Sequence, residues 1–140
     1  MPERPGHLGV GDRLREPAAA ELTASAFALE AADGGLLWRG LSLADLAHIT
    51  MLVEREIVPQ AAGSRLLAAL LRLHALGGDE LAFEGAHGDA YTNRERRLHQ
   101  EAPDEAGWLK AGRARREAST IAYLLATRSD SWTCWRRRAG

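Results

Sequence analysis

A basic segment near the middle of the second half of the chain holds the side chains best suited to chemistry. It reads Lys110-Ala-Gly-Arg-Ala-Arg-Arg116 and precedes an expected helix. Free amides at the N-terminus of a helix favour anions, so Arg113 and Arg115 at this position can bind a carboxylate. The alternative is a solvated basic turn with no ligand, in which exposed charges contribute little. In either case we expect Arg113 on the surface, where its replacement by alanine leaves the fold intact.

A second polar segment lies just before the first. Thr92-Asn93-Arg94-Glu95 has the pattern of a capping box, in which Thr92 accepts from first-turn amides and Glu95 reaches back to the Thr92 N–H. The pattern predicts a short basic helix that ends at Pro103. A loop through residues 104–107 then leads to Trp108 and the basic segment, and a second helix, with Arg113 and Arg115 at its start, runs through Tyr123.

Nucleic-acid binding is disfavoured, although arginines are frequent here. Acidic residues alternate with the arginines between positions 94 and 116, which favours ordinary pairs along the helix. The formal net charge is −1, so no general affinity for nucleic acid or an anionic membrane is expected. The aromatic-basic end of the chain, with Trp132 and Trp135, can dock a partner, or it is a frayed terminus.

No other catalytic, metal or cofactor site is predicted. His48 has no second ligand at metal-binding spacing. Cys134 is the only cysteine and has no catalytic partner pattern, which excludes an internal disulfide and fits a reducing, cytoplasmic location. A phosphate-binding glycine loop and a serine-nucleophile motif are not found. No apolar run reaches the ~18 residues that a membrane span needs.

The elements that must position the basic segments are predicted to be helices only. The 140 residues allow one domain, divided into a mobile arm (1–16), a helical domain (17–128) and an aromatic-basic tail (129–140) that starts at a turn-like Ser-Asp-Ser. Pro17 suits the start of a first helix, with Leu22 and Leu29 on its apolar side, which ends at Asp33-Gly-Gly.

Two further helices are expected before the basic segments. Ser42-Leu-Ala-Asp45 is a second capping-box pattern and predicts a helix that runs to Val58. Pro59 begins the next helix, which carries a leucine stripe and ends at Gly77. Such a leucine-rich hairpin, Leu66 to Leu76, is core or interface by default. The fold class is therefore all-α, one irregular bundle of five to six helices.

The two polar segments together resemble the first domain of argininosuccinate lyase, in the fumarase/aspartase superfamily. That family has Asp-x-His-Thr-x-x-Glu-Arg-Arg-Leu, and residues 89–98 here read DAYTNRERRL. It then has Gly-Lys-Leu-His-Thr-Gly-Arg-Ser-Arg-Asn-Asp-Gln, and residues 107–118 read GWLKAGRARREA. Shorter similarities, such as Asp45-Leu-Ala-His48, extend the resemblance over about residues 45–128.

The resemblance implies a set of substrate- or anion-binding positions and no catalytic residue. The family's histidine, threonine and asparagine of the second segment are replaced by Lys110, Ala111 and Arg116, its serine by Ala114, and the histidine of the first segment by Tyr91. Cationic character is kept while specific hydrogen-bonding groups are lost, which suits a dicarboxylate other than argininosuccinate. The implied positions are Thr92, Asn93, Lys110, Gly112, Arg113, Arg115 and Arg116.

Lyases of this family are several times longer, and their later domains supply the catalytic threonine, histidine and serine at sites shared between subunits. The resemblance therefore implies an accessory or split lyase subunit, inactive alone and completed by another polypeptide. The alternative is a non-catalytic protein-interaction module, a pseudoenzyme fragment that buries its leucine-rich hairpin against a partner or a second copy. A decayed remnant without function is the third hypothesis.

Overall fold

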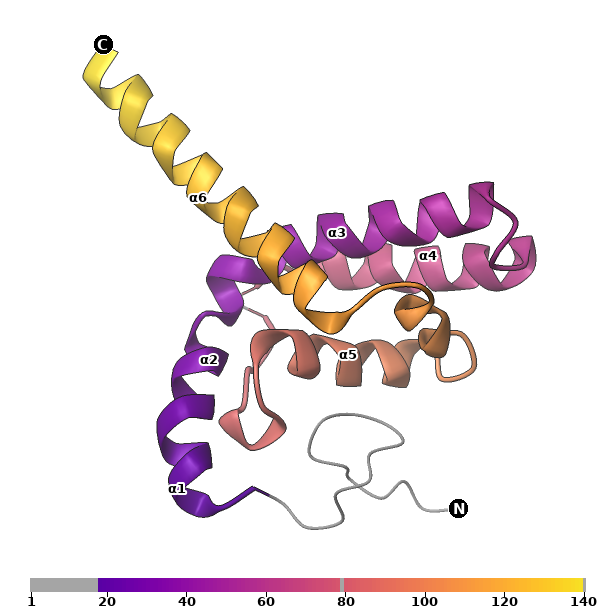
Figure 1. Cartoon of the computed structure of the whole chain (residues 1–140), viewed down its shortest axis with the longest axis horizontal. Coiled ribbons are helices and arrows are strands. Elements are labelled where there is room, and N and C mark those ends of the chain that lie inside the picture. The colour runs from indigo at the N-terminus through magenta and orange to yellow at the C-terminus, as the bar shows by residue number, and fades with distance from the viewer. Residues whose placement is uncertain (1–17, 79, 140) are drawn as a thin grey trace.

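The computed structural model describes residues 18–78 and 80–139, and these residues are helical without any strand (Figure 1). The all-α prediction is confirmed. The predicted arm at residues 1–16 and the helix start at Pro17 lie outside the described residues. Helices α3 and α4 lie side by side, and α6 crosses α3 before it extends away from the rest of the fold (Figure 1).

The first helical segment is irregular. It consists of α1 (Ala20–Leu22), a π-helical stretch η1 (Thr23–Phe27) and α2 (Ala28–Ala32). The predicted end at Asp33 is confirmed, but Gly34 already begins α3. Leu22 and Leu29 were predicted on the buried side and are instead exposed, because Ala31 is the residue of this segment that enters the core. Gly34 is required there, since a Cβ would lie 2.4 Å from the Phe83 ring.

Helix α3 (Gly34–Glu54) contributes residues to the core along most of its length. It differs from the sequence-based prediction in two respects. Ser42 and Asp45 do not cap a helix, because they lie in its interior, where both are buried. The apolar pattern continues through both residues, so tertiary packing overrides the local capping signal. The helix also ends at Glu54 rather than Val58, and Glu56 takes a positive φ of 59° in the turn that follows.

By length and composition alone, α3 would be able to cross a membrane, with 21 residues and a mean hydropathy of 1.3. Half of this span is buried inside the fold, where α3 packs on α4 and α6. A core helix passes such a test readily, and the packing of α3 on α4 and α6 is that of a core helix.

Helix α4 (Gln60–Leu76) follows the prediction closely. Pro59 is its N-cap and Gly77, at φ 77°, ends it. The predicted leucine stripe, Leu66, Leu70 and Leu73, is fully buried. It packs against residues of α3, of α5 and of the 3₁₀ turn η3 (Ala106–Lys110). The hairpin therefore forms the core of its own chain, and the hypothesis that it buries itself against a partner is wrong for this stripe.

The remaining elements are η2 (Gly85–His87), α5 (Ala90–Glu101), a 3₁₀ turn η3 (Ala106–Lys110) and α6 (Arg115–Ala139). The end of α5 before Pro103 is confirmed. The helix start predicted at Arg113 and Arg115 is confirmed, since η3 and a short turn lead from Trp108 to α6, which begins at Arg115. The turn predicted at residues 129–131 is wrong, since α6 continues through them, helped by the absence of glycine and proline from positions 115–139.

Candidate functional site: a buried arginine cluster beside an open groove

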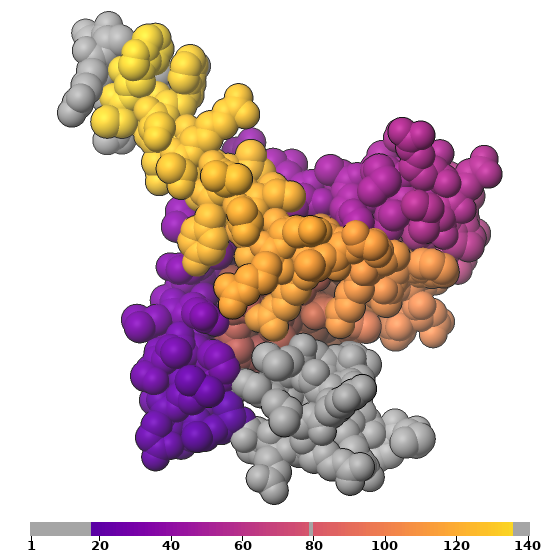
Figure 2. Space-filling view, in the orientation of Figure 1, coloured from indigo at the N-terminus to yellow at the C-terminus, as the bar shows by residue number. Residues whose placement is uncertain are grey.

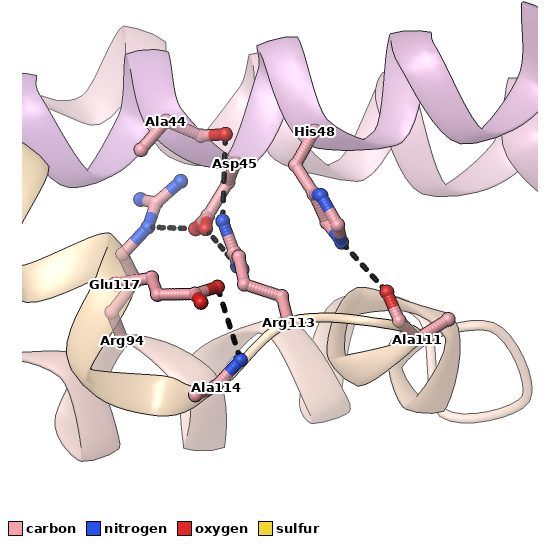
Figure 3. A network of polar contacts seen from close by, with 8 residues as sticks. All are labelled: Ala44, Asp45, His48, Arg94, Ala111, Arg113, Ala114 and Glu117. Atoms are coloured by element: carbon pink, nitrogen blue, oxygen red, sulfur yellow. Dashed lines mark hydrogen bonds and ion pairs between the residues drawn. The ribbon is translucent and has the colours of Figure 1, made fainter.

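A buried carboxylate joins three segments of the chain. Asp45 on α3 accepts a 3.0 Å hydrogen bond from Arg94 Nε on α5 and a 2.6 Å bond from Arg113 Nη2 on the turn before α6 (Figure 3). The exposed fractions of these side chains are 1%, 2% and 6%. Arg113 also donates to the Ala44 carbonyl. The predicted surface position of Arg113 is therefore wrong, because Asp45 draws the guanidinium into the fold.

A second ion pair fixes Arg115. Its guanidinium contacts Asp89, whose other oxygen accepts from the Thr92 amide at 2.8 Å and the Thr92 hydroxyl at 2.7 Å. Asp89, not Thr92, is the N-cap of α5. Burial raises the pKa of Asp89, but the hydrogen bonds from Arg115 and Thr92 outweigh it and hold this pKa below its ordinary value. The predicted capping box is wrong because Asp89 offers the better-placed acceptor.

Asn93 and Lys110 also have internal partners. The Asn93 amide donates to the carbonyls of Glu84, Gly88 and Asp89, and its oxygen accepts from the Glu84 N–H at 2.9 Å. Asn93 thereby fastens the 84–89 loop to α5. Lys110 lies 2.7 Å from Glu95, which is 4% exposed. Glu95 thus neutralises a lysine instead of reaching back to Thr92 as predicted.

A side chain from the first turn of α6, that of Glu117, covers the N-terminus of this helix. Glu117 accepts from the Ala114 N–H at 3.2 Å (Figure 3), which is a weak bond at an exposed position. Arg116 beside it is exposed, and within the described part of the chain no ion pair with it is found. Gly112 takes a φ of 65°, a left-handed conformation that suits glycine at this turn.

An open groove of about 930 Å³ runs between α3 and the first turns of α6. We call it the α3–α6 groove. One part of its wall is polar, with His48, Arg113, Arg116 and Glu117, and the rest is mainly apolar. The apolar part is formed by Leu43, Ala44, Ala47, Met51, Ile121 and Leu125. A second groove of about 810 Å³ lies farther along α6, between Leu36 and the stacked rings of Trp132 and Trp135.

His48 supports the turn that carries Gly112. Its Nε2 lies 3.0 Å from the Ala111 carbonyl (Figure 3), so the ring donates from this nitrogen. Burial is the main cause that lowers the pKa of His48 below 6.5, and the positive charge of Arg113 adds to it, while the Ala111 carbonyl acts in the opposite direction.

The lowered pKa of His48 makes stability depend on pH. The unfolded chain binds a proton at His48 more readily than the folded chain, so this contribution is complete above pH 6.5 and is lost as the pH falls below it. We expect a His48→Gln variant, which keeps a donor for Ala111, to show a flatter stability profile between pH 5 and 7 in urea unfolding. A His99→Gln variant, as a matched control, should keep the wild-type profile. An unchanged profile in His48→Gln would contradict this assignment.

Tyr91 stands where the similar lyase motif has histidine, and it lies between the two arginines of the turn. Burial first, and then the nearby charges of Glu95 and Asp45, raise its pKa to about 12. The Arg115 guanidinium lies 5.9 Å from the centroid of its ring, within reach of a cation–π contact. Tyr91 is therefore a neutral, buried packing partner, and a proton-transfer role at neutral pH does not suit this pKa.

The structure divides the predicted positions between the α3–α6 groove and contacts within the chain, and Arg113 belongs to both groups. Arg113, Arg116 and Gly112 line the α3–α6 groove. Lys110, Arg115, Thr92 and Asn93 bond to their own chain.

The sequence interpretation missed two acids, Asp45 and Glu117. A signal for Asp45 was present, since it is the only formally charged residue between Gly40 and Val53, an unusual position in an apolar helix.

Comparisons with known proteins agree with the resemblance seen in the sequence. Argininosuccinate lyase of Anaeromyxobacter sp. (strain K) is 37% identical over 86 residues, which is 61% of this chain and 18% of the relative. The enzyme of Methanosphaera stadtmanae is 32% identical over 71 residues, 51% of this chain and 15% of the relative. That of Methanococcus maripaludis is 30% identical over 87 residues, with shares of 61% and 18%.

The similarity to argininosuccinate lyase is thus confirmed for the larger part of this chain, which spans less than a fifth of the length of these relatives. No family model matches the chain. No solved structure matches it either, so the likeness to the first domain of the lyase stays a prediction at the level of the fold.

Proposed function

We propose that this chain is an accessory domain of an argininosuccinate-lyase-like protein, which presents a carboxylate-binding groove to an active site completed by another polypeptide. The observation that carries the proposal is the position of Arg113 and Arg116 in the wall of the α3–α6 groove, at the glycine turn of the lyase-like segment. The domain alone is inactive in this proposal.

The groove offers part of what an elimination reaction needs. Breaking a carbon–nitrogen bond next to a carboxylate requires a base, a proton donor and cationic groups that grip carboxylates. Arg113 is held rigidly by Asp45, and a charge fixed in advance costs little reorganisation when a ligand arrives. The two candidate bases in the groove wall are already engaged, since His48 donates to the Ala111 carbonyl and Glu117 accepts from the Ala114 N–H. The groove therefore binds and orients, and the base comes from the partner.

Glu117 limits the affinity of the isolated domain. Its carboxylate occupies the Ala114 N–H at the start of α6, where a ligand carboxylate would also be favoured. A dicarboxylate must displace the exposed Glu117 side chain to reach this N–H. The bound dicarboxylate would then lie beside Arg116, the next residue in the sequence. Because Glu117 competes with the ligand, we expect the domain alone to bind a dicarboxylate weakly. A partner that closes the groove should strengthen this binding.

The partner surface is the exposed apolar side of α6, which stands clear of the rest of the molecule (Figure 2). Leu124 and Trp135 are 65% and 59% exposed there. Large exposed apolar side chains of this kind mark interaction sites. The partner that fits is an amphipathic helix of the completing lyase-type chain, with apolar side chains at helical spacing that enter the two grooves along α6.

We expect the purified chain alone to show no formation of fumarate from argininosuccinate, followed by absorbance at 240 nm. The partner of the tagged chain is captured from extracts of its own cells and identified by mass. The purified pair is then assayed for release of fumarate from argininosuccinate and from other substituted succinates, because the substitutions disfavour argininosuccinate itself. Turnover by the pair and none by either chain alone supports the proposal. Turnover by this chain alone contradicts the proposal. So does a pair that shows neither turnover nor binding of a dicarboxylate.

A non-catalytic interaction module is the second candidate. It is favoured by the internal ion pairs of Lys110, Arg113 and Arg115, which leave these three predicted anion contacts bonded to acids of their own fold. Succinate titration by calorimetry separates the two functions. Heat of binding to the purified pair is expected for the lyase-type domain, and a stable pair that binds no dicarboxylate would establish the interaction module instead.

A further inference from the structure

The buried arginine of α5 uses only part of its hydrogen-bonding capacity. Arg94 Nε donates to Asp45, and the guanidinium carbon lies 4.7 Å from the centroid of the Trp38 ring. The two outer nitrogens, Nη1 and Nη2, point past Asp45 toward α3 (Figure 3). Both are buried, and neither has a hydrogen-bond partner among the described residues. Four N–H donors of a charged group are thus enclosed without an acceptor.

A buried serine lies on the same face of α3 as the two residues that Arg94 contacts. Trp38, Ser42 and Asp45 follow one another on one face of α3, at spacings of four and three residues. Because Arg94 contacts Trp38 and Asp45, its side chain spans the position of Ser42 between them. The Ser42 side chain is fully buried, and its oxygen likewise has no partner in the described part of the chain.

The charge balance around Ser42 is positive. Two buried guanidinium groups, Arg94 and Arg113, share the single carboxylate of Asp45. Of the other acids in this region, Glu95 is paired with Lys110, and Glu117 is exposed and accepts from the Ala114 N–H. An uncompensated buried charge is costly, as is each buried donor that lacks an acceptor. The cluster of Arg94, Arg113 and Asp45 therefore lacks one negative charge and a hydrogen-bond acceptor.

We propose that Arg94 and Ser42 bind a chloride-sized monovalent anion between α3 and α5. Arg94 Nη1 and Nη2 and the Ser42 hydroxyl donate to it, and it neutralises the second guanidinium of the cluster. An anion fits better than a water molecule, because the unpartnered nitrogens are all donors and a water brings protons that need acceptors of their own. The exposed fractions of 0% for Ser42 and 2% for Arg94 restrict the ligand to a compact ion. This site is separate from the α3–α6 groove and does not rest on the function proposed for it.

The test is thermal unfolding of the full chain as chloride replaces gluconate at constant ionic strength and pH. A ligand that binds only the folded state raises the folded-to-unfolded ratio by about elevenfold at ten times its dissociation constant. We expect a saturating rise in Tm with chloride, and bromide should substitute for it. Equal Tm values in chloride and gluconate would overturn the proposal.

Two variants show whether the effect comes from this site. Ser42→Ala keeps a helix-favouring residue and removes one ligand, so it should fold and lose most of the chloride response. Ser64→Ala, at an exposed position of α4, should keep the full response. Broadening of the ³⁵Cl resonance by wild-type protein, reduced by Ser42→Ala, provides a readout independent of stability. A full chloride response in Ser42→Ala would also overturn the assignment.

Discussion

Replacement of Asp45 by asparagine is expected to destabilise the fold by about 3–5 kcal/mol, the usual cost of removing one partner from a buried ion pair. The carboxylate is 1% exposed and accepts from both Arg94 and Arg113. Without its charge, two guanidinium groups remain buried with a neutral amide between them. The loss should appear as a lower urea midpoint, since the change in exposed surface on unfolding stays the same.

Asp130→Asn is the matched control for Asp45→Asn. Asp130 lies on the exposed part of α6, so the same change of charge there should alter stability by less than about 0.5 kcal/mol. If the two variants lost the same small amount of stability, Asp45 would not be the link between α3, α5 and the turn before α6.

The second large effect is expected from Gly40→Ala, at the crossing of α3 and α6. A Cβ on Gly40 would lie 2.6 Å from Ala122 Cα and 2.9 Å from the Ala122 carbonyl oxygen. These are backbone atoms, so α6 must shift as a whole. Overpacking of this kind costs about 1–3 kcal/mol, which exceeds the ~1 kcal/mol that alanine gains over glycine in a helix. We expect a net fall in Tm.

Gly35→Ala gives the opposite expectation and serves as the control. It lies in the same helix, and a Cβ there would meet no atom within 4 Å. Its helix propensity should therefore raise stability by up to ~1 kcal/mol. A Gly40→Ala variant as stable as Gly35→Ala would mean that α6 does not approach α3 as closely as described.

Local signals in the sequence located several elements correctly. The leucine stripe of α4, the start of α4 at Pro59 and the end of α5 before Pro103 each depend on neighbouring residues, and each is confirmed. The caps were placed wrongly at Thr92 and Ser42. In the first case a nearby aspartate competes for the same amides, and in the second the helix continues through the capping residue because its apolar face packs on other helices.

The candidate site was only partly predictable because its contacts are distant in sequence. Asp45 is 49 residues from Arg94 and 68 from Arg113. The basic residues were correctly placed near the start of a helix, but their pairing with specific acids depends on how α3, α5 and α6 pack. The extension of α6 was missed because Ser129-Asp130-Ser131 resembles a turn, although no glycine or proline breaks the helix there.

The three-way contact at Asp45 also determines which parts of the molecule open together. The turn before α6 is tied through one carboxylate to α3 and α5, whose other faces form the core. The floor of the α3–α6 groove therefore belongs to the same cooperative unit as the core and persists until global unfolding. The outer turns of α6 extend away from the rest of the fold (Figure 1). The chain thus combines a recess whose shape is tied to the core with a helix end that projects beyond it.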